Sequence, residues 1–299
     1  MSDYHLHLHP HEPAEGGPPP GEYPVGLIEA YVEKAAERGV SELGFTEHLY
    51  RCVESIPVLG KFWEREENKD LAAHTEEFVA ADRNLSLERY VEAIEGAKDR
   101  GLPVKLGLEV DFFAETIDQV LDLLSPYPFD FLIGSVHWIG GWSVDSSGVA
   151  YEYESRGIDL AWEQYFELEA QLAASGKVDV LAHVDLVKKY GYRPKEEPVD
   201  LYRRVVEGAA ASGTSVEVSS QGLRKPAGEV YPSPLFLKMF QDAGVAITFA
   251  SDGHFVEEAA YGHDQVVEAA RNAGYSSHLR FTRRVPYPVP IGDDPLHSA

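Results

Sequence analysis

Seven short apolar runs alternate along the chain with seven amphipathic segments, and this repetition limits the possible folds more than any other feature. The runs have the length of buried strands, and the segments after them have apolar residues three and four positions apart, as helices do. The expected strands are Tyr4–Leu8, Glu42–Phe45, Val104–Val110, Phe131–Val136, Val178–Ala182, Ser215–Val218 and Ala246–Ala250. The expected helices are Leu27–Arg38, Leu87–Arg100, Thr116–Leu124, Leu160–Ala174, Pro198–Ala211, Pro234–Asp242 and His263–Ala273. Seven strand–helix units predict an α/β fold with a parallel sheet and favour its closure into a barrel.

Three segments depart from the alternation. Glu12–Pro24 is rich in proline and glycine and predicts an irregular loop. Residues 50–85 are charged with little apolar periodicity, which predicts an excursion that covers the mouth as a lid, and residues 280–299 predict an extended tail. Otherwise residues 1–299 are expected to form a single domain.

Composition narrows the class of protein. The net charge of −24 disfavours a broad nucleic-acid or membrane surface. The chain lacks the roughly 20 consecutive apolar residues of a membrane helix, shows no signal-peptide pattern, and has one cysteine, which excludes an internal disulfide framework. A cytoplasmic enzyme is therefore expected.

Residues of the types that bind metals lie in or directly after nearly every expected strand. These residues are His5, His7, His48, Glu109, His137, His183, Asp252 and His254. Because the carboxyl ends of parallel β/α strands face a common mouth, the sequence predicts that they converge. His5 and His7 are two positions apart, so a strand presents both imidazoles on one face. Imidazoles and carboxylates suit zinc, iron or manganese, and we expect two to three divalent ions, which together can hold a hydroxide and bind the oxygens of a phosphate.

The remaining histidines carry a weaker signal, because a lone histidine is usually packed or exposed without binding a metal. His9 follows the first strand and fits an ordinary loop position. Four further histidines are expected at the surface: His74, His263, His278 and His297.

Six short motifs in a fixed order resemble a known family. They are DYHLHLH, GFTEHL, GLEVDF, IGSVHW, VLAHVDLVKKYG and SDGHF. Together they resemble the PHP (polymerase and histidinol phosphatase) family, and within it the PHP-type histidinol phosphatases. The resemblance covers Asp3 to about His263 and implies a distorted seven-stranded β/α barrel with three metals at the carboxyl ends of its strands.

The resemblance also implies a ligand set. One metal would be bound by His5, His7, Glu109 and Asp252; a second by Glu109, His137 and His183; and a third by His48, His254 and one residue of the loop after the first strand. The family has a histidine six residues after the second histidine of H-x-H, where this chain has Pro13. His11, Glu12 or Glu15 must replace it; residue type favours His11 and reach favours Glu15.

A phosphorylated substrate needs positive charge close to these ligands. SSQGLRK places Ser219 and Arg224 after the sixth strand and resembles an element of the histidinol phosphatases. VKKYGYR adds Lys188, Lys189 and Arg193, and ESRGID adds Arg156. These residues are the candidates for binding the substrate, arginine being the better partner for phosphate.

The preferred hypothesis is hydrolysis of L-histidinol phosphate to L-histidinol and phosphate in histidine biosynthesis, through a hydroxide that bridges two metals. Asp252 and His254 are the candidates for moving the proton to the leaving group. Three alternatives remain: a phosphoesterase acting on nucleotides or short oligonucleotides, a metal-dependent amidohydrolase, and a metal-binding module without activity. The expected partner is a small phosphomonoester, with no membrane and no long nucleic acid.

Overall fold

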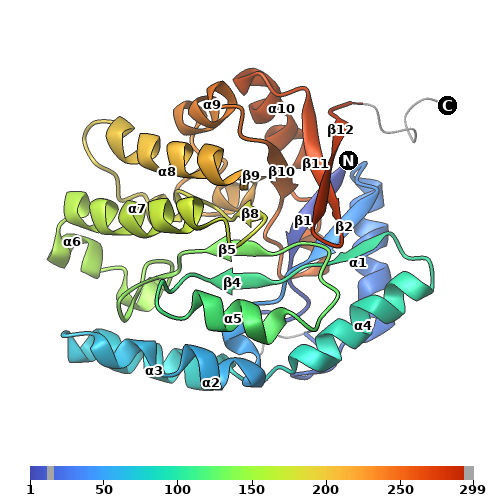
Figure 1. Ribbon diagram of the computed structural model, residues 1–299, viewed down its shortest axis with the longest axis horizontal. Helices are drawn as coiled ribbons and strands as arrows, with labels where there is room; N and C mark the ends of the chain where they lie inside the picture. The colour runs from blue at the N-terminus through green and yellow to red at the C-terminus, as the bar shows by residue number, and fades with distance from the viewer. Residues whose placement is uncertain (12–16, 293–299) are drawn as a thin grey trace.

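The computed structural model describes residues 1–11 and 17–292 (Figure 1). Its strands are β1 Ser2–Leu6, β2 Glu42–Phe45, β3 Val104–Leu106, β4 Glu109–Asp111, β5 Ile133–Ser135, β6 Trp138–Ile139, β7 Trp142–Ser143, β8 Val180–Leu181, β9 Ser215–Ser219, β10 Ile247–Ala250, β11 Ser277–Thr282 and β12 Val285–Pro290. Its helices are α1 Val25–Glu37, α2 Ile56–Leu59, α3 Lys69–Asp82, α4 Leu87–Asp99, α5 Ile117–Leu124, α6 Glu152–Arg156, α7 Ile158–Ser175, α8 Val199–Ser212, α9 Pro234–Asp242 and α10 His263–Ala273. All seven expected helices are present, and none of the helices described is long and apolar enough to cross a membrane.

Two parallel sheets form the centre of the molecule. One has the order β1-β2-β3 and the other the order β10-β9-β8-β5-β4. Among the described residues, single bridges join the two sheets, between Leu6 and Gly253 and between His48 and Glu109. The parallel α/β fold is thus as predicted, whereas a closed seven-stranded barrel is not confirmed, because no continuous ladder connects the sheets.

The break between the sheets falls inside one predicted strand. The expected run Val104–Val110 is divided into β3, which pairs with β2, and β4, which pairs with β5. Gly107 lies at the division, and a Cβ there would be 2.5 Å from Cζ of Phe131. A Cβ at Gly44 of β2 would be 2.6 Å from the same atom. Both positions therefore need glycine to make room for the Phe131 ring.

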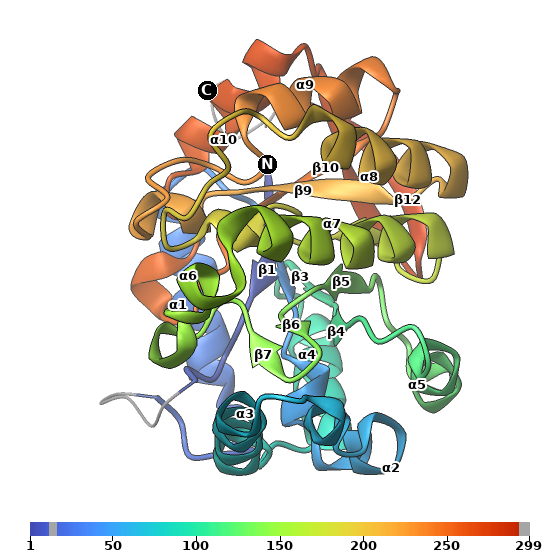
Figure 2. The ribbon, with the colours of Figure 1, turned by 90° about the vertical axis from the view of Figure 1, so that its left-hand side faces the viewer.

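Helices surround the two sheets. Figure 2 shows α7 and α8 side by side across β9, with α9 and α10 beyond them and α4 on the far side. The rings of Tyr202 in α8 and Phe236 in α9 stack with centroids 4.2 Å apart. Gly213 ends α8 in the left-handed conformation, with φ of 78°, as expected for a helix C-cap.

An antiparallel hairpin covers the amino-terminal ends of the parallel strands. It is formed by β11 and β12, where the sequence predicted an extended tail. Phe281 of the hairpin packs against Tyr4 and Phe131, with centroids 6.2 Å and 5.9 Å apart. Side chains fill the amino-terminal end of the parallel strands, so a functional site is expected at their carboxyl ends.

Candidate metal centre and its pocket

The predicted metal ligands converge at the carboxyl ends of the strands. His5 lies in β1 and His7 directly after it, while Glu109 opens β4. His137, His183 and Asp252 follow β5, β8 and β10, respectively, and His48 and His254 also lie beyond strand ends. Most of these side chains are buried, and His254 is partly exposed. Parallel strands that end at one place thus bring together residues up to 249 positions apart in the sequence.

The Glu109 carboxylate lies at the centre of this group and divides its oxygens between two sets of imidazoles. Its Oε2 lies 3.3 Å from His5 Nε2 and 2.7 Å from His48 Nδ1. Its Oε1 lies 3.4 Å from His137 Nε2 and 3.2 Å from His183 Nε2. A carboxylate placed in this way can bridge two cations.

Asp252 is the second carboxylate of the group. Its Oδ1 lies 3.5 Å from His7 Nε2 and 3.6 Å from His254 Nδ1. The His7 ring stacks on those of His48 and of His254, at centroid distances of 4.3 Å and 4.2 Å. Asp252 has φ of 50° and His183 has φ of 23°, and such left-handed backbone in residues other than glycine concentrates at functional sites.

The donors of this group fit divalent cations. Two sets whose ligand atoms lie within 4.8 Å of one another are His5, His7 and Asp252, and His7, His48 and His254; two others centre on Glu109. His5 Nε2, both nitrogens of His7 and of His48, and Glu109 Oε2 are buried and form no hydrogen bond with any residue that the structure describes. Buried polar atoms rarely lack a hydrogen-bond partner, and cations bound among these atoms would give them partners as metal ligands.

Two carboxylates contact imidazoles at the ring nitrogen that faces away from Glu109. Glu217 Oε2 lies 2.9 Å from His5 Nδ1, and Asp111 Oδ1 lies 2.7 Å from His137 Nδ1. Such contacts fix the tautomer, so that the other ring nitrogen is free to bind metal. Neither carboxylate was predicted from the sequence, although Glu217 is a charged residue within the otherwise uncharged strand SVEVS.

The electrostatics also favour metal binding. Burial raises the pKa of Glu109, but the nearby His48, His5 and His137 lower it by more, so its pKa lies well below the usual range. Burial lowers the pKa of His48 and His254 well below the usual range. Glu109 is therefore ionised and the imidazoles of His48 and His254 are neutral, which are the forms that bind metals. At His5 and His137 burial also lowers the pKa, but the nearby carboxylates raise it by more, so binding a metal there displaces a proton.

The comparisons with known proteins agree with this geometry. Residues 25–221 match the model of the PHP domain family. The chain belongs to the PHP domain family.

Curated PHP relatives that resemble this chain include a probable histidinol-phosphatase of Deinococcus radiodurans, 27% identical over 84% of this chain and 88% of the relative. Another is the histidinol-phosphatase of Bacillus subtilis, 27% identical over 81% of this chain and 92% of the relative. Among solved structures, the histidinol phosphate phosphatase of Lactococcus lactis, in complex with zinc, L-histidinol and phosphate, superposes with a TM-score of 0.71 at 20% identity. It covers 96% of this chain and 98% of its own, so the two share a fold.

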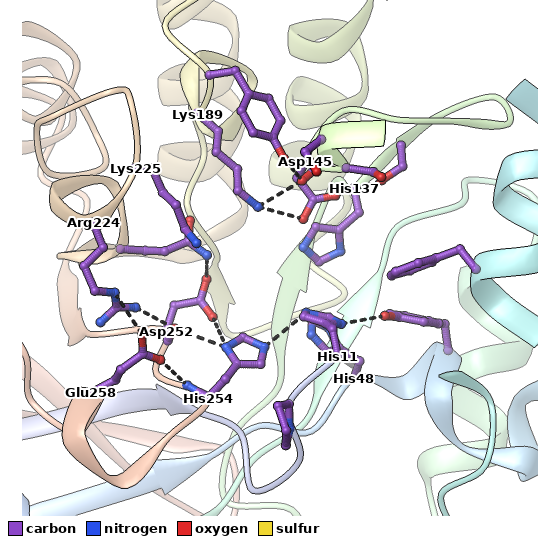
Figure 3. Close-up of a pocket in the computed structure, with 18 of the residues that line it drawn as sticks. His11, His48, His137, Asp145, Lys189, Arg224, Lys225, Asp252, His254 and Glu258 are labelled. Atoms are coloured by element: carbon purple, nitrogen blue, oxygen red, sulfur yellow. Dashed lines mark hydrogen bonds and ion pairs between the residues drawn. The ribbon is translucent and has the colours of Figure 1, made fainter. Parts of the chain in front are cut away.

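A pocket of about 430 Å³ opens onto four of these candidate metal ligands (Figure 3). His48, His137, Asp252 and His254 form part of its floor and walls. The cationic side chains that line it are those of Lys189, Arg224 and Lys225. Arg224 and Lys189 were among the candidates named from the sequence, through the SSQGLRK and VKKYGYR motifs, whereas Lys225 was not named.

The other predicted substrate residues do not line this pocket. Arg156 contacts Glu152 and lies over the Trp142 ring. Arg193 pairs with Glu229 at 2.7 Å and faces a separate surface hollow.

Lys188 is fully buried and pairs with Asp185 at 2.6 Å, while Ser219 pairs through its backbone with Tyr231. These residues were predicted because they lie in motifs close to strand ends, and the place of a motif along the chain does not determine the direction of a side chain.

The histidines outside the main group have different environments. His9 Nδ1 contacts Glu47 at 3.2 Å and lies outside the metal-type clusters, in agreement with a packing role. His11 lines the pocket beside His254. His263 and His278, expected at the surface, are buried against Phe249. Glu12, Glu15 and His297 lie outside the described residues.

Proposed function

We propose that this chain is a metal-dependent phosphatase that hydrolyses L-histidinol phosphate to L-histidinol and phosphate. The observation that carries the proposal is the buried Glu109 carboxylate, whose two oxygens face separate sets of imidazoles. One imidazole of each set, His48 and His137, lines a pocket that also has three cationic side chains. The two relatives described above, a probable histidinol-phosphatase and a histidinol-phosphatase, support the substrate.

The ligand atoms support a centre of two to three ions, of which zinc is the best supported. His5, His7 and Asp252 would hold one ion, and Glu109 with His137 and His183 a second. His48 and His254 would contribute to a third. Divalent ions in such a site lower the pKa of water to about 7 and neutralise charge that develops on a phosphoryl group.

Arg224 and Lys225 would bind the phosphate end of the substrate. Arg224 Nη2 donates hydrogen bonds to the carbonyl oxygens of Ser251 and Asp252, both at 2.9 Å, which holds the guanidinium next to the metal ligands. Its Nη1 is buried and forms no hydrogen bond with a described residue, so this nitrogen is available to an anion. Positive groups held in advance where charge develops lower the barrier to phosphoryl transfer.

Asp145 would bind the ammonium group of the substrate. Three carboxylates line the pocket, and two of them are engaged: Asp252 faces the imidazoles, and Glu258 accepts from the His254 amide and faces Arg224. Asp145 accepts from Ser143 Oγ at 2.9 Å and from Lys189 Nζ at 3.3 Å, and its side chain is 25% exposed. A carboxylate has about four lone-pair sites, so it can also accept from an ammonium group.

Asp252 and His254 remain the candidates for moving the proton to the leaving alcohol. Both line the pocket, and Asp252 Oδ2 accepts a hydrogen bond from Gln221 Nε2. We also infer that the chain works as one catalytic domain whose residues 50–85 form a wall of the pocket, because Tyr50 and Phe78 of this segment line it.

Phosphate release from a panel of esters tests the proposal. Zinc-loaded protein would be assayed with L-histidinol phosphate, p-nitrophenyl phosphate and a set of nucleotides. A clear preference for L-histidinol phosphate is expected. Preference for nucleotides would contradict the substrate while keeping the metal chemistry, and no release from any ester would contradict the phosphatase assignment.

A further inference from the structure

Three imidazoles near the pocket share one type of contact. His5 and His137 each have one ring nitrogen toward Glu109 and the other toward a buried carboxylate. His11 repeats this pattern: its Nδ1 lies 3.2 Å from Asp82 Oδ2, and its Nε2 points the opposite way, toward the site. Asp82 is 4% exposed and is the last residue of α3, within the 50–85 excursion.

The free end of His11 lies among candidate ligands. Its Nε2 is 3.1 Å from His254 Nε2, and its ring centroid is 4.9 Å from that of His48 and 4.7 Å from that of His254 (Figure 3). Two neutral imidazoles with nitrogens this close satisfy each other with one hydrogen bond at most, whereas a cation binds both. His11 thus has the position and the orientation of a further ligand.

Asp82 is itself held firmly. Tyr50 Oη donates to Asp82 Oδ2 at 3.0 Å and lies 3.2 Å from His11 Nδ1. Arg51 Nη2 lies 3.5 Å from Asp82 Oδ1, and the same guanidinium donates to the carbonyl oxygens of His9 and Pro10. Tyr50 and Arg51, which follow β2, therefore hold both the backbone before His11 and the Asp82 carboxylate in place.

We propose that Asp82 is a positioning residue that, together with Tyr50, holds His11 as a ligand of the third metal, so that helix α3 is part of the metal centre. This inference rests on the metal-dependent function proposed above. The Asp82 carboxylate accepts a hydrogen bond from Nδ1–H of His11, which keeps Nε2 unprotonated and available to metal. The excursion then has a chemical role in addition to forming a wall of the pocket.

Asp82→Asn tests this role, because an amide has nearly the same shape and can donate to Nδ1 instead of accepting from it. That reversal places the proton on Nε2 and blocks metal binding there. We expect zinc content, measured by mass spectrometry, to fall from three to two ions per chain at limiting free zinc. In zinc titrations the weakest site should lose about 10–100-fold in affinity.

Three further variants make the test specific. Asp70→Asn, an exposed aspartate at the other end of α3, should keep the wild-type zinc content. Tyr50→Phe keeps the ring and removes only the hydroxyl, so it should weaken the same site by a smaller factor. Glu15→Gln should leave the zinc content unchanged, since His11 supplies the ligand. Thermal melts of the zinc-free proteins show whether Asp82→Asn remains folded. If it does not, the zinc affinity of Tyr50→Phe tests the proposal in its place.

Zinc content separates this proposal from the proposed function. Wild-type zinc content and affinity in folded Asp82→Asn, or loss of an ion in Glu15→Gln, would overturn the role of Asp82 and His11. Only two ions in the wild type would overturn it as well. Each of these three results could occur while the protein still hydrolyses L-histidinol phosphate fully. If instead the protein binds three ions but does not hydrolyse L-histidinol phosphate, only the proposed function is overturned.

Discussion

The Asp145 carboxylate allows recognition of the substrate to be tested at a single residue. Asp145→Asn should lower kcat/KM for L-histidinol phosphate by about 10–100-fold, because a hydrogen bond between charged groups contributes about 1.5–3 kcal/mol. The same change should have little effect on 3-(imidazol-4-yl)propyl phosphate, which lacks the ammonium group. Steady-state kinetics with both esters measure this difference. Equal losses would show that Asp145 acts by holding Lys189, and would remove it from ammonium recognition.

Arg224 gives the corresponding test for the phosphate end. Arg224→Ala should raise KM by about 10–100-fold, because a charge-assisted contact to phosphate is lost. Zinc content should not change, since the guanidinium contacts carbonyl oxygens and Glu258 and no candidate ligand atom. Arg193→Ala is the matched control and should behave as wild type. An unchanged KM in Arg224→Ala would exclude this residue from the phosphate site.

At this scale the sequence predicted which candidate metal ligands come together better than it predicted which cationic side chains line the pocket. His5, Glu109 and Asp252 lie in or directly after parallel strands, and the carboxyl ends of such strands meet at one place whatever the loops do. Lys188 and Lys189 are neighbours in one loop, yet Lys188 pairs with Asp185 in the interior while Lys189 faces the pocket. The local backbone conformation determines which of two neighbouring side chains points into the pocket, and sequence patterns do not encode that conformation.

At the scale of single elements, the division between β3 and β4 depends on packing around Phe131. Gly107→Ala would place a Cβ 2.5 Å from Cζ of this ring and 2.8 Å from the Phe45 carbonyl oxygen. Overpacking of this kind costs about 1–3 kcal/mol, so urea unfolding should show a corresponding loss of stability.

Gly96→Ala in α4 is the matched control, because nothing lies within 4 Å of a Cβ there. It should stabilise the protein by about 0.5–1 kcal/mol, since glycine inside a helix is unfavourable. Equal effects of the two substitutions would contradict the packing argument.

The regular elements could be predicted because each has its own periodic pattern. β2 was predicted with the bounds that the structure shows, and α9 likewise. The division of Val104–Val110 could not be predicted, since it depends on Phe131, which is distant in sequence. The sequence did not predict α3, because its buried and exposed faces differ little in polarity. Its buried residues include Thr75 and Asp82 as well as apolar ones.

For the whole molecule, two buried histidines should make stability depend on pH. Burial lowers the pKa of His263 to about 4 and that of His278 to about 3. Above pH 6.5 neither the folded nor the unfolded state binds these protons. Below pH 6.5 the unfolded state binds them first, so stability falls with decreasing pH, by at most about 1.4 kcal/mol per pH unit for each histidine.

His278→Asn should therefore reduce the loss of stability between pH 6.5 and 4.5. Urea unfolding of the zinc-free protein at several pH values measures the slope, and the difference from wild type isolates this residue from the histidines of the metal centre. The same slope in both proteins would show that His278 titrates normally in the folded state.

The central claim for the whole molecule is that strands from both sheets position one carboxylate, Glu109, between two sets of ligands that support phosphate hydrolysis. The most direct measurement is zinc content and phosphate release from L-histidinol phosphate in one preparation of Glu109→Gln, with Glu92→Gln on the exposed face of α4 as control. We expect loss of at least one zinc ion and a fall in kcat/KM of more than about 100-fold, with the control unchanged. Full zinc content with full activity in Glu109→Gln would contradict it.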